Sequence, residues 1–214
     1  MSVMIQEQKT ALSPTQQLVK RSLDVVMSAV ALIVFAPIIG LVALAIKLDS
    51  KGDMLFKQDR IGEGGRIFKI YKFRSMVVGA PKVQPSVNAY DEDGNLIHKQ
   101  KSDPRVTRVG RIIRKTSLDE LPQLFNILKG DMSLVGPRPE MPWMVEEHYQ
   151  EWQHARFSVP QGLTGWWQIN GRSDKPMHLY THEDLEYIRN YSIWFDLYII
   201  MKTPWVVIRG KGAY

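Results

Sequence analysis

Two adjacent carboxylates, Asp119 and Glu120, stand between a basic run and a Pro-Arg-Pro tripeptide in the segment 114–139. Pro122 fits best in the first turn of a helix, where its missing N–H would have no partner, so the acidic pair is predicted to lie at or just before a helix start. The free N–H groups and the positive dipole end of such a helix favour ionised carboxylates and attract phosphate. The pattern therefore predicts a site that handles phosphate.

The same residues also allow a simpler structural role. Ser117-x-x-Glu120 matches a capping box, in which the acidic side chain only satisfies backbone donors. The segment carries more positive charge than one cap requires, so capping and catalysis both stay open from the residues alone. The surrounding cations are Arg111, Arg114, Lys115 and Arg138. The helix after Pro122 is predicted to bury one apolar face, formed by Leu121, Leu124, Phe125 and Leu128.

The composition indicates a single domain with a hydrophobic core and an anionic partner. Of 214 residues, 44% are hydrophobic, and 28 Lys and Arg against 22 Asp and Glu give a net charge of +6. This charge suits nucleic acid, anionic lipid or phosphorylated small molecules. The absence of cysteine excludes disulfides and thiolate metal sites. Six tryptophans and eight tyrosines suit a protein at a membrane interface.

Residues 25–46 carry no charge, and their length matches the roughly 20 residues with which a helix crosses the hydrocarbon core of a membrane. Pro37, with Gly40 one turn later, predicts a broken or sharply kinked helix. Basic residues flank both ends, so the orientation is undecided. A spanning helix and a hairpin that returns to its own side are both open, and the residues alone favour the spanning helix. Residues 1–17 are predicted to form a mobile tail.

The rest of the chain predicts a β-hairpin followed by helices. Two β-type runs, 54–58 and 66–73, are joined by a glycine turn at 62–65. Neither the acidic turn at 91–95 nor the pair His178 and His182 completes a metal-ligand set. The further predictions are a basic helical stripe over 105–115, an amphipathic helix over 140–156, a ligand-holding loop over 160–172 and an interfacial helix over 187–208.

From Lys20 to the C-terminus the chain resembles the bacterial sugar transferases, monotopic phosphoglycosyl transferases that move a hexose 1-phosphate from a UDP-sugar to undecaprenyl phosphate. The resemblance is carried by Lys20-Arg21-x-x-Asp24, the proline-interrupted apolar run, YKFRSM at 71–76, the segment 102–139 and GLTGWWQINGRS at 162–173. It implies a membrane-associated α+β fold. A re-entrant helix-break-helix hairpin would occupy residues 18–50, in place of a spanning helix. A cytoplasmic catalytic domain would occupy residues 51–214, with interfacial amphipathic helices and the small β-hairpin.

The resemblance also implies roles for single residues. Asp119 would be the nucleophile that attacks the β-phosphate, releases UMP and holds the sugar phosphate covalently, and it would also contact Mg²⁺. Glu120 would accept the proton of the incoming polyprenyl phosphate. Contacts to phosphate or uridine are expected from Arg114, Arg138, Lys72, Arg74 and Arg172. For the last three, solvated surface charge is the alternative.

These features predict a magnesium-dependent polyprenyl-phosphate hexose-1-phosphate transferase at the cytoplasmic face of the bacterial inner membrane, catalysing the first membrane step of polysaccharide assembly. The C-terminal GKGAY and the excursion at 79–104 resemble the exopolysaccharide branch, which suggests glucose or galactose. The expected partners are a UDP-hexose, undecaprenyl phosphate and membrane lipid, and no nucleic acid is expected. A second copy of the chain, forming a homodimer, is a further candidate partner. The alternatives are a membrane glycosyltransferase that releases UDP and a membrane-tethered polyanion-binding protein, for which no nucleic-acid module is recognisable.

Overall fold

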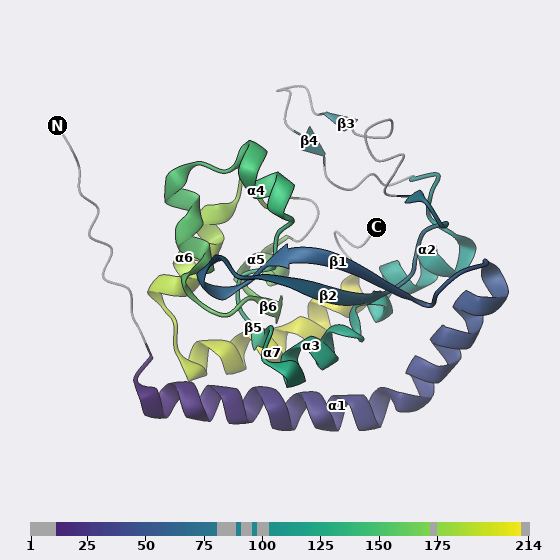
Figure 1. Ribbon diagram of the computed structural model, residues 1–214. Helices are drawn as coiled ribbons and strands as arrows, with labels where there is room; N and C mark the ends of the chain where they lie inside the picture. The colour runs from purple at the N-terminus through teal and green to yellow at the C-terminus, as the bar shows by residue number, and fades with distance from the viewer. Residues whose placement is uncertain (1–11, 81–88, 91–95, 98–102, 172–174, 211–214) are drawn as a thin grey trace.

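A long N-terminal helix lies beneath a mixed layer of short strands and helices (Figure 1). The computed structural model describes residues 12–80, 89–90, 96–97, 103–171 and 175–210. The mixture of helices and strands confirms the predicted α+β character. The elements in chain order are α1 (Pro14–Asp49), β1 (Leu55–Ile61), η1 (Glu63–Gly65), β2 (Ile67–Phe73), β3 (Ala89–Tyr90), β4 (Leu96–Ile97), α2 (Arg108–Lys115), η4 (Leu118–Glu120), α3 (Gln123–Lys129), β5 (Ser133–Val135), α4 (Pro142–His148), η5 (Glu151–Ser158), β6 (Gly162–Thr164), α5 (Trp166–Asn170), α6 (Thr181–Arg189) and α7 (Ile193–Arg209).

Helix α1 begins earlier than the predicted membrane element at 18–50 and ends close to its predicted end. Ser13 and Gln16 form a capping box, with Pro14 in the first turn, so the prediction of a tail is wrong for residues 14–17. Of the two predicted outcomes at Pro37, a break and a sharp kink, the break does not occur, because the helix continues through Pro37. The axis of α1 bends in its last third (Figure 1), which agrees with the kinked alternative. A proline removes one backbone hydrogen bond, and the apolar helical residues on either side maintain the helix across that gap.

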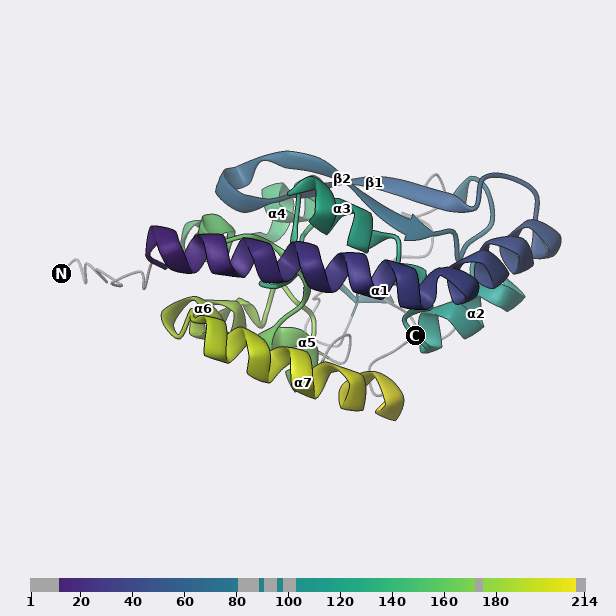
Figure 2. The ribbon, with the colours of Figure 1, turned by 90° about the horizontal axis from the view of Figure 1, so that it is seen from below.

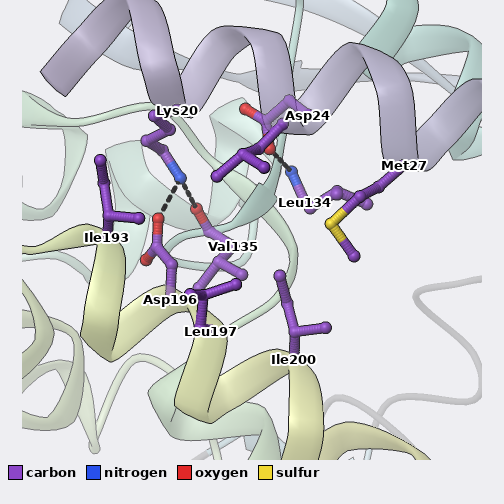
Figure 3. Close-up of a pocket in the computed structure, with 10 residues that line it drawn as sticks. Lys20, Asp24, Met27, Leu134, Val135, Ile193, Asp196, Leu197 and Ile200 are labelled. Atoms are coloured by element: carbon purple, nitrogen blue, oxygen red, sulfur yellow. Dashed lines mark hydrogen bonds and ion pairs between the residues drawn. The ribbon is translucent and has the colours of Figure 1, made fainter. Parts of the chain in front are cut away.

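Two buried polar residues of α1 fasten the helix to the rest of the fold (Figure 3). Lys20 Nζ lies 2.5 Å from Asp196 Oδ2 of α7 and donates to the carbonyl oxygen of Val135 in β5 at 3.1 Å. Asp24, one turn further along, accepts a hydrogen bond from the backbone N–H of Leu134 at 2.9 Å. The Lys-Arg-x-x-Asp motif therefore joins α1 to both β5 and α7.

The predicted β-hairpin is present. Strands β1 and β2 pair antiparallel, with Gln58 opposite Ile70 and Phe56 opposite Lys72. The glycine cluster forms the turn, since Gly64 and Gly65 adopt positive φ values of 66° and 81°. The predicted turn at 91–95 lies outside the described residues, although β3 and β4 on either side of it pair antiparallel.

Three predictions about the second half of the chain are wrong, and a fourth is wrong in part. The loop expected at 160–172 contains β6 and α5, and β6 pairs parallel with β5. The helix expected over 140–156 ends at His148, because Tyr149 is extended, and continues as the 3₁₀ segment η5. The helix expected over 187–208 is two helices, with Ser192 capping the start of α7. In the predicted apolar face of α3, Leu124 is buried and Leu121 packs against the core, but Phe125 is 51% exposed. Ile127, which the prediction left out, is fully buried.

Helices α1 and α7, which lie side by side in the view from below (Figure 2), both carry exposed apolar side chains that form an apolar surface. Helix α1 is the one helix of the described residues that is long and apolar enough to cross a membrane. Only 11% of its most apolar 18-residue window is buried. We call this surface the apolar underside; its members include Leu18, Val26, Val30, Ile33, Val34, Leu41, Leu44, Trp194, Met201, Trp205 and Ile208.

Candidate active site

Glu120 is held between two cations that come from distant parts of the chain. Its Oε1 lies 3.2 Å from Lys72 Nζ, and its Oε2 lies 3.2 Å from Arg138 Nη1. Arg138 Nη2 also donates to Oε1, so the guanidinium grips the carboxylate with both of its terminal nitrogens. The three side chains are each only 14–17% exposed. The structure thus brings together three of the site residues expected from the sequence, Glu120, Lys72 and Arg138.

The geometry does not support the capping-box alternative for the acidic pair. Ser117 adopts a left-handed backbone with φ 57° and makes no side-chain capping bond, and Leu118–Glu120 form one 3₁₀ turn before Pro122 begins α3. The carboxylate of Glu120 turns to Lys72 and Arg138 instead. The prediction that the pair lies just before a helix start is confirmed.

Asp119 shares this charged environment. It acts electrostatically on Lys72, Arg114 and Arg138. Burial disfavours charged Arg138, but the attraction of Glu120 and then Asp119 leaves its pKa raised. Burial lowers the pKa of Arg114, and Asp119 opposes that effect. Two carboxylates and three cations therefore form one cluster.

Lys72 has a strongly perturbed pKa. Burial lowers it from 10.5 to about 8, although the negative charge of Glu120 raises it and the positive charge of Arg138 lowers it further. An ammonium group with a pKa near 8 changes its charge close to physiological pH. Lys72 is accordingly the cation of the cluster whose charge depends most on pH.

Asn126 and Gly110 set the positions of the cations. The side chain of Asn126 in α3 accepts a hydrogen bond from Tyr71 N–H at 2.9 Å and donates one to the Lys69 carbonyl at 2.8 Å. These two bonds hold β2 next to α3 and the 3₁₀ turn that carries Asp119 and Glu120. Gly110 allows α2 to lie directly on the chain at Ser75, since a Cβ there would stand 2.0 Å from the Ser75 carbonyl oxygen. Arg114 Nε then donates to Ser75 Oγ at 2.8 Å.

The strand pair β5–β6 positions the backbone that leads to Arg138. Gly136 N–H donates to the Thr164 carbonyl at 3.0 Å, and Gly162 N–H donates to the Pro137 carbonyl at 2.8 Å. No side chain fits at Gly136, where a Cβ would stand 2.1 Å from the carbonyl oxygen of Pro160. The GLTG motif at 162–165 thus supports the Pro-Arg-Pro segment.

Arg74, one of the predicted phosphate or uridine contacts, does not join the cluster. The guanidinium of Arg74 donates to the Lys51 and Ser50 carbonyls at 2.7 Å each, which satisfies backbone groups after the end of α1. Arg74 is 8% exposed, so it is not a solvated surface charge. Its hydrogen bonds go to backbone carbonyls rather than to the Glu120 cluster. Arg172 lies outside the described residues.

The donor set fits magnesium bound through a single carboxylate. Among the described residues no group of three or more His, Asp or Glu side chains comes together. Glu120 contacts Lys72 and Arg138 in the structure, and the neighbouring Asp119 is the carboxylate expected from the sequence to contact Mg²⁺. Mg²⁺ commonly binds through one or two carboxylates, with water and substrate phosphates completing its shell.

Several buried residues around the Pro-Arg-Pro segment were missed by sequence reasoning. Arg60 of β1 donates to the Pro139 carbonyl at 3.3 Å and lies 3.4 Å from Glu140 Oε1, and burial lowers its pKa to about 10. Arg156 of η5 donates to the Arg138 carbonyl at 2.7 Å. The regular alternation of β1 gave no sign of a role for Arg60, and the incorrect helix predicted over 140–156 hid the position of Arg156.

A family model described as "Bacterial sugar transferase" matches residues 15–210. The chain belongs to the bacterial sugar transferase family. Relatives include an undecaprenyl-phosphate galactose phosphotransferase of Salmonella typhimurium, which is 41% identical over 94% of this chain and 42% of the relative. A UDP-glucose:undecaprenyl-phosphate glucose-1-phosphate transferase of Escherichia coli is 41% identical over 96% of this chain and 43% of the relative's length.

Membership in the bacterial sugar transferase family extends across nearly the whole chain. The exopolysaccharide production protein ExoY of Rhizobium meliloti is 39% identical over 98% of this chain and 94% of its own length. Against the longer relatives from Salmonella and Escherichia, the chain spans about two fifths of their length. The cluster around Glu120 lies well inside the matched region.

Proposed function

We propose that this protein transfers a hexose 1-phosphate from a UDP-sugar to undecaprenyl phosphate. The observation that carries the proposal is the pairing of Glu120 with Lys72 and Arg138 beside Asp119. Cations gathered around two carboxylates suit a reaction in which a diphosphate binds and negative charge shifts between oxygens. The printed names of the relatives, a galactose phosphotransferase and a glucose-1-phosphate transferase acting on undecaprenyl phosphate, support this substrate class.

The proposed reaction has two displacement steps. A carboxylate oxygen of Asp119 attacks the β-phosphorus of the UDP-sugar; the bond from that phosphorus to the bridging oxygen breaks, and UMP leaves with the electron pair. A phosphate oxygen of undecaprenyl phosphate then attacks the same phosphorus, which restores the Asp119 carboxylate and forms a sugar diphospholipid. A carboxylate nucleophile divides one difficult transfer into two easier ones.

The cations neutralise charge in both steps. Arg138 and Lys72 contact Glu120 in the structure, and the phosphates of the donor would compete with Glu120 for the same N–H groups. Once released from these bonds, Glu120 would be able to accept the proton of the incoming lipid phosphate. Magnesium, when bound at Asp119, supplies further neutralisation of the diphosphate.

We also propose that the apolar underside rests in the cytoplasmic leaflet of the bacterial inner membrane. Exposed Trp194 and Ile208 of α7, which are 81% and 79% exposed, continue the apolar surface of α1. The bend of α1 in its last third suits a re-entrant helix that returns to the cytoplasmic side. A soluble UDP-sugar and a lipid phosphate would then meet on the same side of the membrane.

The reaction is tested by identifying the nucleotide product. Purified protein in detergent is incubated with undecaprenyl phosphate, magnesium and a panel of UDP-sugars, and the released nucleotide is separated. UMP is expected, with glucose or galactose as the preferred sugar. Release of UDP would establish a glycosyltransferase instead, and an absence of turnover with every sugar would contradict the proposal. Chelation by EDTA is expected to stop UMP release, and added Mg²⁺ to restore it.

A further inference from the structure

The guanidinium of Arg156 is completely buried and fully engaged. Its Nε and Nη2 lie 2.9 Å and 2.7 Å from Asp184 Oδ2, and its Nη1 donates to the Tyr149 hydroxyl at 3.0 Å. Nη2 also donates to the backbone carbonyl of Arg138 at 2.7 Å. Burying an ion pair is costly, and apolar residues of similar volume often stabilise a fold as well or better. The arrangement therefore calls for a role beyond stability.

That role follows from the sequence of the segment it contacts. Arg138 stands between Pro137 and Pro139, which have no N–H group, so hydrogen bonds can hold these two residues only through their carbonyls. The fold supplies a donor to each of three consecutive carbonyls. Gly162 N–H binds the carbonyl of Pro137 at 2.8 Å, Arg156 that of Arg138 at 2.7 Å, and Arg60 that of Pro139 at 3.3 Å.

The two arginines belong to one buried network. Tyr149, which accepts from Arg156, lies 3.5 Å from Glu140 Oε2, and Glu140 Oε1 in turn lies 3.4 Å from Arg60. Asp184 of α6 completes the network at its far end. Elements β1 and η5 thus hold the neighbouring carbonyls of Pro139 and Arg138, and α6 holds Arg156 in place. The side chain of Arg138 reaches Glu120.

We propose that Arg156 is a positioning residue for the transfer reaction, which holds the backbone of Arg138 so that its guanidinium meets the transferring phosphate. The inference rests on the proposed function, since it requires Arg138 to act on that phosphate. Lysine at position 156 keeps the charge but has one nitrogen in place of three, so it cannot serve Asp184, Tyr149 and the carbonyl together. A small displacement of Arg138 would weaken its contact with the phosphate in the transition state.

The test is a double-mutant cycle measured on UMP release by the full chain. Arg156→Lys is expected to lower kcat about 10-fold, with a smaller effect on KM for the UDP-sugar. In the Arg138→Ala background the same substitution is expected to cause no further loss, because the side chain that it positions is absent. Arg21→Lys is the matched control, since Arg21 also binds two backbone carbonyls, those of Ile127 and Leu128, and should retain full activity.

Each other outcome has a distinct meaning. Equal losses in both backgrounds would show that Arg156 supports only the fold and would overturn the inference. Full activity of Arg138→Ala would remove the role proposed for Arg138 itself, and the inference with it. If Arg156→Lys does not fold, Tyr149→Phe replaces it in the cycle, because it deletes only the hydroxyl. A smaller loss that disappears in the Arg138→Ala background supports positioning, and an equal loss in both backgrounds refutes it.

Discussion

At the scale of single residues, the two neighbouring carboxylates face different surroundings. Glu120 contacts both Arg138 and Lys72 directly, whereas Asp119 acts on the same two cations electrostatically. An adjacent pair in sequence therefore need not be equivalent in function. The difference suits a division of labour in which Asp119 attacks phosphorus and Glu120 organises the cations.

Asp119→Asn is expected to abolish both UMP release and the covalent sugar-phosphate adduct, because an amide is a very poor nucleophile towards phosphorus. Mass spectrometry of the intact protein after incubation with the UDP-sugar alone detects the adduct. Asp59→Asn removes an exposed carboxylate paired with Lys69 and should behave as the unaltered protein. An adduct on Asp119→Asn protein would show that another side chain is the nucleophile.

The pH dependence of activity should follow Lys72. Its pKa is lowered to about 8, so the ammonium loses its proton as the pH rises through that value, and kcat/KM is expected to fall above about pH 8. Arginine stays charged throughout this range, so the kcat/KM of the Lys72→Arg protein should not fall above about pH 8. The measurement is kcat/KM between pH 6 and pH 10 for both proteins. Parallel profiles for both proteins would exclude Lys72 as the titrating group.

At the scale of elements, α1 is placed by a few buried polar contacts. Lys20 and Asp196 are each 8% exposed in their side chains and join α1 to α7. Lys20→Met leaves Asp196 buried without a cation, which is expected to lower the free energy of unfolding by about 3–5 kcal/mol. Thermal unfolding in detergent measures the change.

Two comparisons make this prediction specific. Lys20→Met combined with Asp196→Leu should recover most of the lost stability, because no uncompensated charge remains buried. Lys69→Met breaks a pair whose side chains are 64% and 52% exposed, and it should cost less than about 1 kcal/mol. Equal losses for Lys20→Met and Lys69→Met would mean that the contact with α7 contributes little.

At the scale of the whole molecule, the proposed re-entrant path of α1 places both of its ends on the cytoplasmic side. Thr15 and Lys51 are exposed near opposite ends of the helix, and the chain has no cysteine of its own. Thr15→Cys and Lys51→Cys are both expected to react with a membrane-impermeant maleimide from the cytoplasmic side of inverted vesicles. Asp59→Cys, on the exposed face of β1, marks that side. Labelling of the two ends from opposite sides would establish a spanning helix.

The sequence by itself determined the family and several of the local elements. The acidic pair before Pro122, the hairpin around Gly64 and Gly65 and the long apolar helix all follow from properties of nearby residues. These features depend on backbone preferences and apolar runs within a few turns of the chain. The motifs also sufficed to indicate the family that the comparisons show.

Only the tertiary structure decided which charges meet. Lys72 and Glu120 are 48 residues apart, and Lys20 and Asp196 are 176 apart. The three-residue strands β5 and β6 have too little periodicity to predict their pairing, yet that pairing places Pro137 beside Gly162. Arg74 was expected from the sequence to contact phosphate, but its guanidinium donates hydrogen bonds to the backbone carbonyls of Ser50 and Lys51 after α1. A buried charge takes whichever partner folding brings within reach, and spacing along the chain does not record that choice.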